Sequence, residues 1–334
     1  MRAGLFVGAG LAAAAVGTAV AVSRARAEAD RIRGLADPYP YEVVGREPRG
    51  VTSFLDRPDG TRIRVIEAGD GPTVVLAHGF AITLVEWSII WDLLLEQGYR
   101  VVTFDQRGHG QSTIGNDGIG SVQMAGDYLA VLDHTGTSDA VLVGHSMGGF
   151  LAIAAMLEVP GFAERISGLV LFATFSGDVT REAPQNKVQI PLLRSGVLQK
   201  VISNDTIGVL FAASLCGDAP SPAMARVFLE TFRQQDHAAL LPILEAFGSE
   251  DRKDRLGEIT VPTIVICGTS DNTTPPWQSE QLAAGIPGAR MVWVQGAGHM
   301  VNWETPSALV EAVEELSRTG IHSKHEASSP RSGR

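Results

Sequence analysis

The sequence predicts an α/β protein with a mostly parallel sheet, and three observations support this fold class. First, short apolar runs rich in Val and Ile recur along the chain, and most lack the polar alternation of a half-exposed strand. Second, helix-period stretches separate most of these runs, as in sheets whose parallel strands are joined by crossover helices. Third, a chain of 334 residues that is 45% hydrophobic can bury a core of this kind.

The beginning of the chain differs from the rest, because the twenty residues 3–22 carry no charge. At helical rise this span covers about 30 Å, which is enough to cross a membrane. The arginines that follow it favour a cytoplasmic position for the next domain. We therefore expect residues 1–33 to be a membrane anchor, with the catalytic domain in the cytoplasm. The alternative is a signal segment cleaved after residues 25–27, which would make the protein secreted.

After a Pro-rich linker, residues 34–50, the chain reads as a β-hairpin with an Arg-Pro-Asp-Gly turn at 57–60. Right-handed crossovers place the loops after the parallel strands at one edge of the sheet, where sites of α/β proteins form. We therefore expect an eight-stranded, mostly parallel sheet flanked by helices, with the site at that edge. The eight strands are expected at 51–55, 61–67, 73–77, 100–104, 140–143, 169–173, 263–267 and 291–294.

One interval breaks the alternation of strands and helices. Residues 175–258 contain no clear strand, and a structureless loop of that length is implausible in a compact domain. We expect a small helical cap there, which divides the core into residues 51–174 and 259–319. Residues 320–334 are polar and are expected to form a disordered tail. The cap helices are expected at 189–202, 206–215, 223–234 and 237–247.

The stretch that carries the chemistry is Gly-His-Ser-Met-Gly-Gly, residues 144–149, directly after an apolar run. Gly144 and Gly148 have no Cβ, so the chain can adopt the strained positive-φ turn that lifts the hydroxyl of Ser146 off the sheet. The helix that begins here points N–H groups at a charge that forms beside the serine oxygen. Ser146 is therefore the candidate nucleophile, and the alternative is an ordinary tight turn.

Two further candidate catalytic residues also follow predicted strands. Asp271 comes just after the run at 263–267, where a carboxylate can accept the Nδ1–H of a histidine and fix its tautomer. His299 comes just after the run at 291–294, and histidine is suited to proton transfer near neutral pH. The order Ser, Asp, His, with each residue after a strand, is that of the nucleophile-elbow arrangement.

The remaining site residues are expected around this triad. The backbone N–H groups of Phe80 and Met147 are predicted to form the oxyanion hole. The aromatic side chains of Trp87 and Trp303 are expected to line the substrate pocket. We expect no metal, because no Cys or His spacing indicates a metal site, and no cofactor, because no dinucleotide fingerprint follows the first strands. The net charge of −10 argues against nucleic acid as a partner.

The stretches that contain Ser146, Asp271 and His299, together with two further motifs after predicted strands, resemble the α/β-hydrolase superfamily, in its branch of serine esterases, lipases and cofactor-free haloperoxidases. The resemblance covers roughly residues 51–317. It implies a helical cap between strands 6 and 7, and it implies that Asp105, Arg107 and His109 belong to the scaffold. The motifs that carry it are HGF (78–80), DQRGHGQS (105–112), GHSMGG (144–149), GTSDNTTP (268–275) and GAGHMVNWETP (296–306).

The predicted function is the hydrolysis of carboxylic esters through a serine acyl-enzyme. An apolar cap, aromatic residues and a membrane segment favour a lipophilic substrate, such as a monoacylglycerol or a medium-chain ester. Residues 3–22 would then supply the membrane association. Three alternatives stay open: a cofactor-free haloperoxidase or perhydrolase, an acyl-lactone hydrolase, and a ligand-binding module with little turnover.

Overall fold

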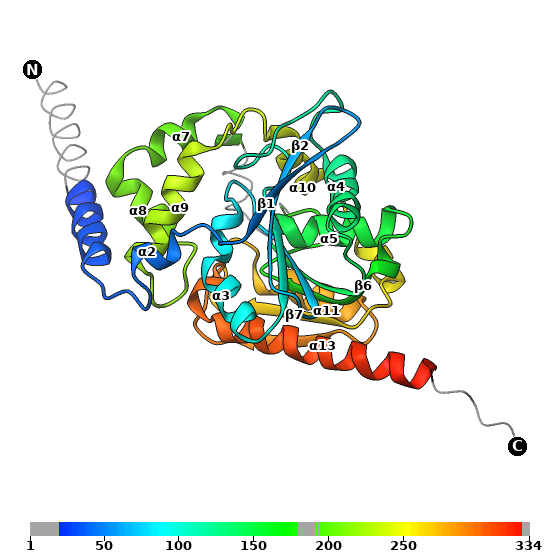
Figure 1. The fold of residues 1–334 in the computed structure, drawn as a ribbon. Helices are drawn as coiled ribbons and strands as arrows, with labels where there is room; N and C mark the ends of the chain where they lie inside the picture. Colours follow the sequence, from blue (N-terminus) through cyan, green and yellow to red (C-terminus); the bar gives the residue numbers. More distant parts are fainter. Residues whose placement is uncertain (1–19, 180–190, 193, 329–334) are drawn as a thin grey trace, which may run out of the picture.

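The computed structural model describes residues 20–179, 191–192 and 194–328 (Figure 1). Within them, eight strands form one sheet in the order β1-β2-β4-β3-β5-β6-β7-β8. The first two pairings, β1 with β2 and β2 with β4, are antiparallel, and all others are parallel. The predicted eight-stranded, mostly parallel sheet is confirmed. The strands are β1 Val51–Asp56, β2 Arg62–Ala68, β3 Thr73–Ala77, β4 Arg100–Phe104, β5 Ala140–His145, β6 Ile166–Phe172, β7 Thr263–Gly268 and β8 Arg290–Val294.

Helices cover both faces of the parallel strands (Figure 1). Successive residues of a strand point to opposite faces, so Val74 and Leu76 pack on one side of β3 and Val75 packs on the other. Both faces are buried, which is why these runs lack polar alternation. The helices on the first face are α3 Ser88–Glu96 and α13 Pro306–Ser328, and those on the second are α4 Ser121–His134, α5 Met147–Glu158 and α11 Pro276–Gly285.

The order of the strands reverses around β3, which lies between β4 and β5. The loops after β3 and β5 therefore meet at one edge of the sheet. Ala77, the last residue of β3, pairs with Gly144 near the end of β5. Ligands of open α/β sheets bind at such a switch point, outside the carboxyl ends of the strands. Ser146 lies at this point of the fold.

The described residues between β6 and β7 are also largely helical. An isolated bridge between Gly177 and Asp251 brings the two ends of this insertion together. The start of α9 follows from its sequence, because the Ser221 hydroxyl accepts the Met224 N–H at 3.2 Å and proline follows the serine. Among the described residues of this interval, we refer to the following helices as the cap helices: α7 Val197–Ile202, α8 Asp205–Ala213, α9 Pro222–Gln234 and α10 Leu241–Ser249.

The segment expected to be a linker, residues 34–50, is packed against the cap helices. It contains α2 Tyr41–Val44, which contacts α9. The Tyr41 hydroxyl donates to Glu230 on α9 at 2.6 Å. Residues 20–33, which precede this segment, are helical. Arg33 in this helix donates to the carbonyl of Asp205 on α8 at 3.1 Å. These contacts join the segment to the cap rather than leave it as a free linker.

Two expectations about the ends of the chain are corrected. The expected membrane-anchored localisation is not supported, because the described part of the chain contains no helix long and apolar enough to cross a membrane. Residues 3–19 of the expected span lie outside the described residues. The tail expected to be disordered, 320–334, is helical as far as Ser328, since α13 continues past its packed first turns. Its last residues, 329–334, are not among those described.

Candidate active site

Ser146 lies at the sharp turn between β5 and α5. Its φ is 49° and its ψ is −114°, a strained backbone conformation that residues other than glycine rarely adopt. A Cβ on Gly148 would lie 2.1 Å from the carbonyl oxygen of Ala77. A Cβ on Gly144 would lie 2.6 Å from the Cα of Gly149. Only glycine at these two positions allows β3, β5 and α5 to approach closely enough to make the turn.

Asp271 and His299 form a buried pair in the loops that follow β7 and β8. His299 Nδ1 lies 3.0 Å from Asp271 Oδ2. Oδ1 of Asp271 accepts the N–H groups of Thr273 and Thr274 at 2.8 and 2.9 Å. These two bonds fix the carboxylate, and the carboxylate in turn fixes the orientation of the imidazole ring.

The surroundings of Asp271 favour its ionised form, although its side chain is almost fully buried. Burial alone raises the pKa of this carboxyl, but the neighbouring His299 and the hydrogen bonds from His299 and Thr274 outweigh it. The pKa of Asp271 is therefore lowered from its usual value. An ionised Asp271 holds the proton of His299 on Nδ1, which leaves Nε2 as the basic nitrogen.

Ser146 and His299 line the same cavity. Among the described residues, no hydrogen bond joins the Ser146 hydroxyl to the His299 ring. In enzymes without bound substrate such bonds are often long, and they tighten when the substrate binds. The fold thus brings the three residues of the expected triad to one edge of the sheet, with the contact between Asp271 and His299 already formed.

The two expected oxyanion donors belong to Met147, next to Ser146, and to the loop after β3. Met147 is the first residue of α5, so its N–H has no acceptor within that helix. A Cβ on Gly79 would lie 3.6 Å from the Cβ of Ser146, so the loop that holds Phe80 passes close to the serine. Neither N–H has a hydrogen-bond partner in the part of the chain that the structure describes. Both donors are therefore free to bind a negatively charged oxygen.

A cavity of about 330 Å³ extends from Ser146 to the cap helices. Part of its wall is an aromatic cluster, in which the ring of Phe247 lies edge-to-face against Phe80 and Phe175 at 5.8 and 5.3 Å. None of the described lining residues is Asp, Glu, Lys or Arg. Its apolar lining consists of Phe80, Ile82, Phe175, Val179, Leu198, Phe211, Leu215, Phe228, Phe232, Leu244, Phe247 and Met300.

The two tryptophans expected at the substrate pocket do not line this cavity, which corrects that expectation. Trp87 is fully buried and packs edge-to-face on Phe172 of β6 at 5.9 Å. Trp303 is also fully buried, in a cluster with residues of the cap helices. The wall comes instead from phenylalanines such as Phe228 and Phe232, whose i, i+4 spacing marks one face of α9.

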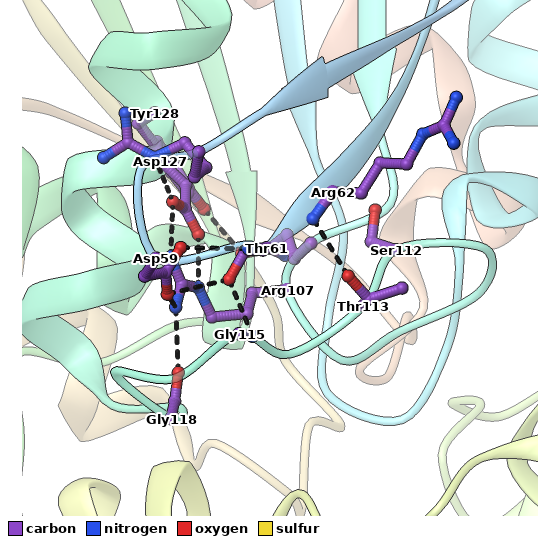
Figure 2. Close-up of polar contacts among 12 residues, drawn as sticks. Asp59, Thr61, Arg62, Arg107, Ser112, Thr113, Gly115, Gly118, Asp127 and Tyr128 are labelled. Atoms are coloured by element: carbon purple, nitrogen blue, oxygen red, sulfur yellow. Dashed lines mark hydrogen bonds and ion pairs between the residues drawn. The ribbon is translucent and has the colours of Figure 1, made fainter.

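A second polar cluster lies outside the cavity, around Arg107 (Figure 2). Arg107 donates to Asp127 at 2.8 Å and to Asp59 at 2.6 Å, and its side chain is 2% exposed. A guanidinium does not release its proton, so this cluster is suited to holding loops together. Nearby, burial raises the pKa of Asp105 to about 6 and lowers that of His109 to about 4. The contacts of Arg107 and the burial of Asp105 and His109 are consistent with the scaffold role expected for these three residues.

Comparison with known proteins gives matches along most of the chain. A family model described as "Alpha/beta hydrolase family" matches residues 74–312. A 2-hydroxy-6-oxononadienedioate/2-hydroxy-6-oxononatrienedioate hydrolase from Klebsiella pneumoniae is 31% identical over 262 residues, which cover 75% of this chain and 90% of the relative. A non-heme haloperoxidase from Rhodococcus erythropolis is 28% identical, over 76% of this chain and 96% of the relative.

The fold also has close counterparts among solved structures. An esterase from Exiguobacterium antarcticum superposes with a TM-score of 0.71 at 23% sequence identity. The match covers 81% of this chain and all of the esterase. At this identity the similarity supports the fold alone.

Proposed function

This chain belongs to the alpha/beta hydrolase family, and we propose that it is a serine hydrolase that cleaves neutral carboxylic esters with an apolar acyl group. The observation that carries the proposal is the position of Ser146 at the base of an apolar cavity, beside the Asp271 and His299 pair. A largely apolar pocket with a few convergent polar groups is typical of sites for small apolar ligands.

The proposed reaction proceeds through an acyl-enzyme. Ser146 Oγ attacks the ester carbonyl while His299 Nε2 takes its proton, and the N–H groups of Phe80 and Met147 stabilise the oxyanion. The bond to the alcohol breaks as His299 returns the proton to the leaving oxygen. His299 then deprotonates a water molecule that attacks the acyl-enzyme, which releases the acid and restores Ser146. Asp271 stabilises the imidazolium throughout.

The lining of the cavity supports a substrate without charge on its acyl part. The relative from Klebsiella pneumoniae is named for a dioate, a substrate with two carboxylates. In this chain the described cavity lining has no Lys or Arg that could pair with a carboxylate. Burying an unpaired carboxylate among phenylalanines is strongly unfavourable. We therefore place the preference with neutral acyl groups, including the medium-chain esters expected from the sequence.

The test is hydrolysis of p-nitrophenyl esters of increasing acyl length, each paired with an analogue of the same length that ends in a carboxylate. We expect turnover of the neutral esters, a much lower kcat/KM for the anionic analogues, and loss of turnover in Ser146→Ala. The control is Ser167→Ala, which changes a half-buried serine outside the cavity that donates to the carbonyl of Asp139. Equal rates for Ser146→Ala and the wild type would falsify the mechanism, and a preference for anionic esters would refute the substrate class.

A second candidate, perhydrolysis, is favoured by the relative from Rhodococcus erythropolis, which is named a non-heme haloperoxidase. Here hydrogen peroxide replaces water as the attacking group on the acyl-enzyme, so the products are a peracid and free Ser146. The peracid would then oxidise a halide ion. Halogenation of an added acceptor in acetate buffer with peroxide and bromide measures this activity. It should disappear in Ser146→Ala, and its absence in the wild type would leave hydrolysis as the only proposal.

A further inference from the structure

A buried pair of charged side chains, Glu86 and His145, lies directly behind the candidate site. Glu86 belongs to the 3₁₀ helix Leu84–Trp87, and His145 is the residue before Ser146. Glu86 is fully buried and His145 is 2% exposed. Glu86 Oε2 lies 3.1 Å from His145 Nδ1. The proposed reaction uses neither group, so their burial calls for an explanation.

The pair contacts two of the loops that supply the site, the oxyanion loop and the histidine loop. Glu86 Oε1 accepts the N–H of Gly79, the residue before the oxyanion donor Phe80, at 3.2 Å. On the other side, His145 Nε2 lies 3.1 Å from the carbonyl oxygen of His299. One chain of hydrogen bonds therefore passes behind Ser146, from the oxyanion loop to the histidine loop. Its members are Gly79, Glu86, His145 and His299.

Two further contacts hold the pair in place. The ring of His145 stacks on Phe172 of β6, with centroids 4.6 Å apart and planes 11° apart. The backbone carbonyl of Glu86 accepts the side-chain amide of Asn302, just after the histidine loop, at 2.9 Å. The Glu86 helix is thus bonded to both loops, and the ring of His145 has little freedom to rotate.

The contacts determine where the protons lie. A carbonyl oxygen can only accept a hydrogen bond, so Nε2 of His145 must carry a proton to bond His299. The Glu86 carboxylate accepts from Nδ1–H on one oxygen and from Gly79 N–H on the other. These contacts are all satisfied when both ring nitrogens of His145 donate and Glu86 accepts, and the NMR experiment below tests this arrangement.

We infer that Glu86 and His145 are positioning residues, which set the distance between the oxyanion donors and the base on either side of Ser146. The inference rests on the proposed serine hydrolase mechanism. Neither side chain takes a proton from the substrate or gives one to it. Their effect is on the geometry of the reacting groups, to which rates are very sensitive.

Two other titratable side chains near the pair, His78 and Tyr128, are uncharged. Burial lowers the pKa of His78 well below its usual value and raises the pKa of Tyr128 well above its usual value, so both side chains are neutral. The ring of His299 also lies close to the pair, with its centroid 4.9 Å from that of His145. Glu86 is therefore the acidic partner of His145 behind Ser146.

The first test compares two substitutions of Glu86. Glu86→Ala removes the bridge, and we expect kcat for a p-nitrophenyl ester to fall roughly 10- to 100-fold with KM nearly unchanged. Glu86→Gln keeps the shape of the side chain, because its amide oxygen can accept from Gly79 and its NH₂ group can donate to Nδ1 of a neutral His145. We expect Gln to recover most of the lost kcat. An unchanged kcat in the Ala variant, or no recovery in the Gln variant, would overturn the inference.

A matched variant at the other end of the pair is His145→Phe. It keeps a ring to stack on Phe172 but removes both donors, so we expect a loss of kcat similar to that in Glu86→Ala. Circular dichroism and the thermal midpoint establish that each variant is folded. A folded His145→Phe variant with wild-type kcat would contradict the inference.

The protonation of His145 can be measured without turnover. In Ser146→Ala protein labelled with ¹⁵N-histidine, we expect NMR to show one imidazole with both nitrogens protonated, which disappears in the Ser146→Ala/His145→Phe variant. Adding Glu86→Gln should leave a single proton on that ring. A neutral His145 in the Ser146→Ala protein would contradict the pair as described. If wild-type protein hydrolyses no ester while His145 is doubly protonated, the proposed function fails and the ion pair stands.

Discussion

Two regions of this molecule bury a carboxylate against a nitrogen base, and they differ in what the base can do. At the candidate site Asp271 bonds His299 at 3.0 Å, and on α4 Asp127 bonds Arg107 at 2.8 Å (Figure 2). Both aspartates are 2% exposed. His299, however, lines a cavity and can exchange its proton, whereas Arg107 is enclosed and stays charged. A buried pair of a carboxylate and a nitrogen base therefore supports chemistry only when the base can exchange its proton and faces a ligand.

The region around Arg107, Asp127 and Asp59, which we call the closed region, shows what a buried charged pair does when it lines no cavity. Arg107 also donates to Asp59 and to the carbonyl of Gly118, so one guanidinium joins the hairpin turn, the loop after β4 and α4. The pairing of Asp59 with Thr61 ties the turn to the start of β2. We therefore expect substitutions in this region to change stability, and substitutions at the candidate site to change rate.

The largest expected effect is at the candidate site. Asp271→Asn should lower kcat by about 10⁴-fold, because the amide favours the wrong tautomer of His299 while the fold is kept. Asp127→Asn is the matched substitution in the closed region, and we expect it to leave kcat within a few-fold of wild type. Steady-state kinetics on a p-nitrophenyl ester measures both. Loss of kcat in a folded Asp127→Asn variant would break the contrast between the two regions.

The next effect is on stability in the closed region. Arg107→Met leaves Asp59 and Asp127 buried without their shared cation, and we expect a loss of about 3–5 kcal/mol in the free energy of unfolding. The control is Arg62→Met, because Arg62 and its partner Asp56 have side chains 55% and 81% exposed, and this pair should contribute at most about 1 kcal/mol. Urea unfolding curves measure both changes. Similar losses in the two variants would contradict the assignment of Arg107.

A smaller effect concerns the pH dependence of stability in the same region. Burial raises the pKa of Asp105 from 3.8 to about 6, so the native carboxyl keeps its proton after the unfolded one has lost it. Relative to Asp105→Asn, the wild type should therefore lose stability as the pH rises from about 4 to about 6, by roughly 2–3 kcal/mol. Urea unfolding of both proteins across this range is the measurement. A constant difference would contradict the burial effect.

The contribution of Asp59 to stability should depend on pH in the opposite direction from that of Asp105, and this difference sharpens the same test. Burial raises the pKa of Asp59, but hydrogen bonds from Thr61 and Arg107 outweigh it and lower the pKa from 3.8 to about 2. Its contribution to stability is therefore present above pH 3.8 and is lost as the pH falls through about 2. A wild type that gains stability over Asp59→Asn in acid would refute this arrangement.

The smallest expected effect is on the acyl preference of the cavity. Phe211 of α8 lines the cavity wall, so Phe211→Ala should lower kcat/KM for a medium-chain ester by about 10-fold and change little for an acetate. The control is Phe54→Ala on β1. Phe54 is 36% exposed and is not among the described residues that line the cavity. The ratio of the two kcat/KM values is the readout. An unchanged ratio in Phe211→Ala would show that α8 does not contact the acyl group.

Most of the strands and the order of the candidate triad could be predicted, because both depend on local sequence. Uninterrupted runs such as 140–143 identify buried strands, and the two glycines around Ser146 identify a turn that excludes a Cβ. The helices between β6 and β7 were predictable from their periodicity. The roles of Trp87 and Trp303 were not, since apolar character alone does not distinguish a core position from a cavity wall.

By itself, the sequence determined which residues end the strands, and therefore that Ser146, Asp271 and His299 would meet at one edge of a parallel sheet. Only the tertiary structure decided what surrounds them. The aromatic wall comes from helices far along the chain, and Glu86 reaches His145 across 59 positions. Periodicity and turn chemistry act over a few residues and can be read from the chain. Pairing between distant side chains depends on how whole elements pack, and it is decided only when the core closes.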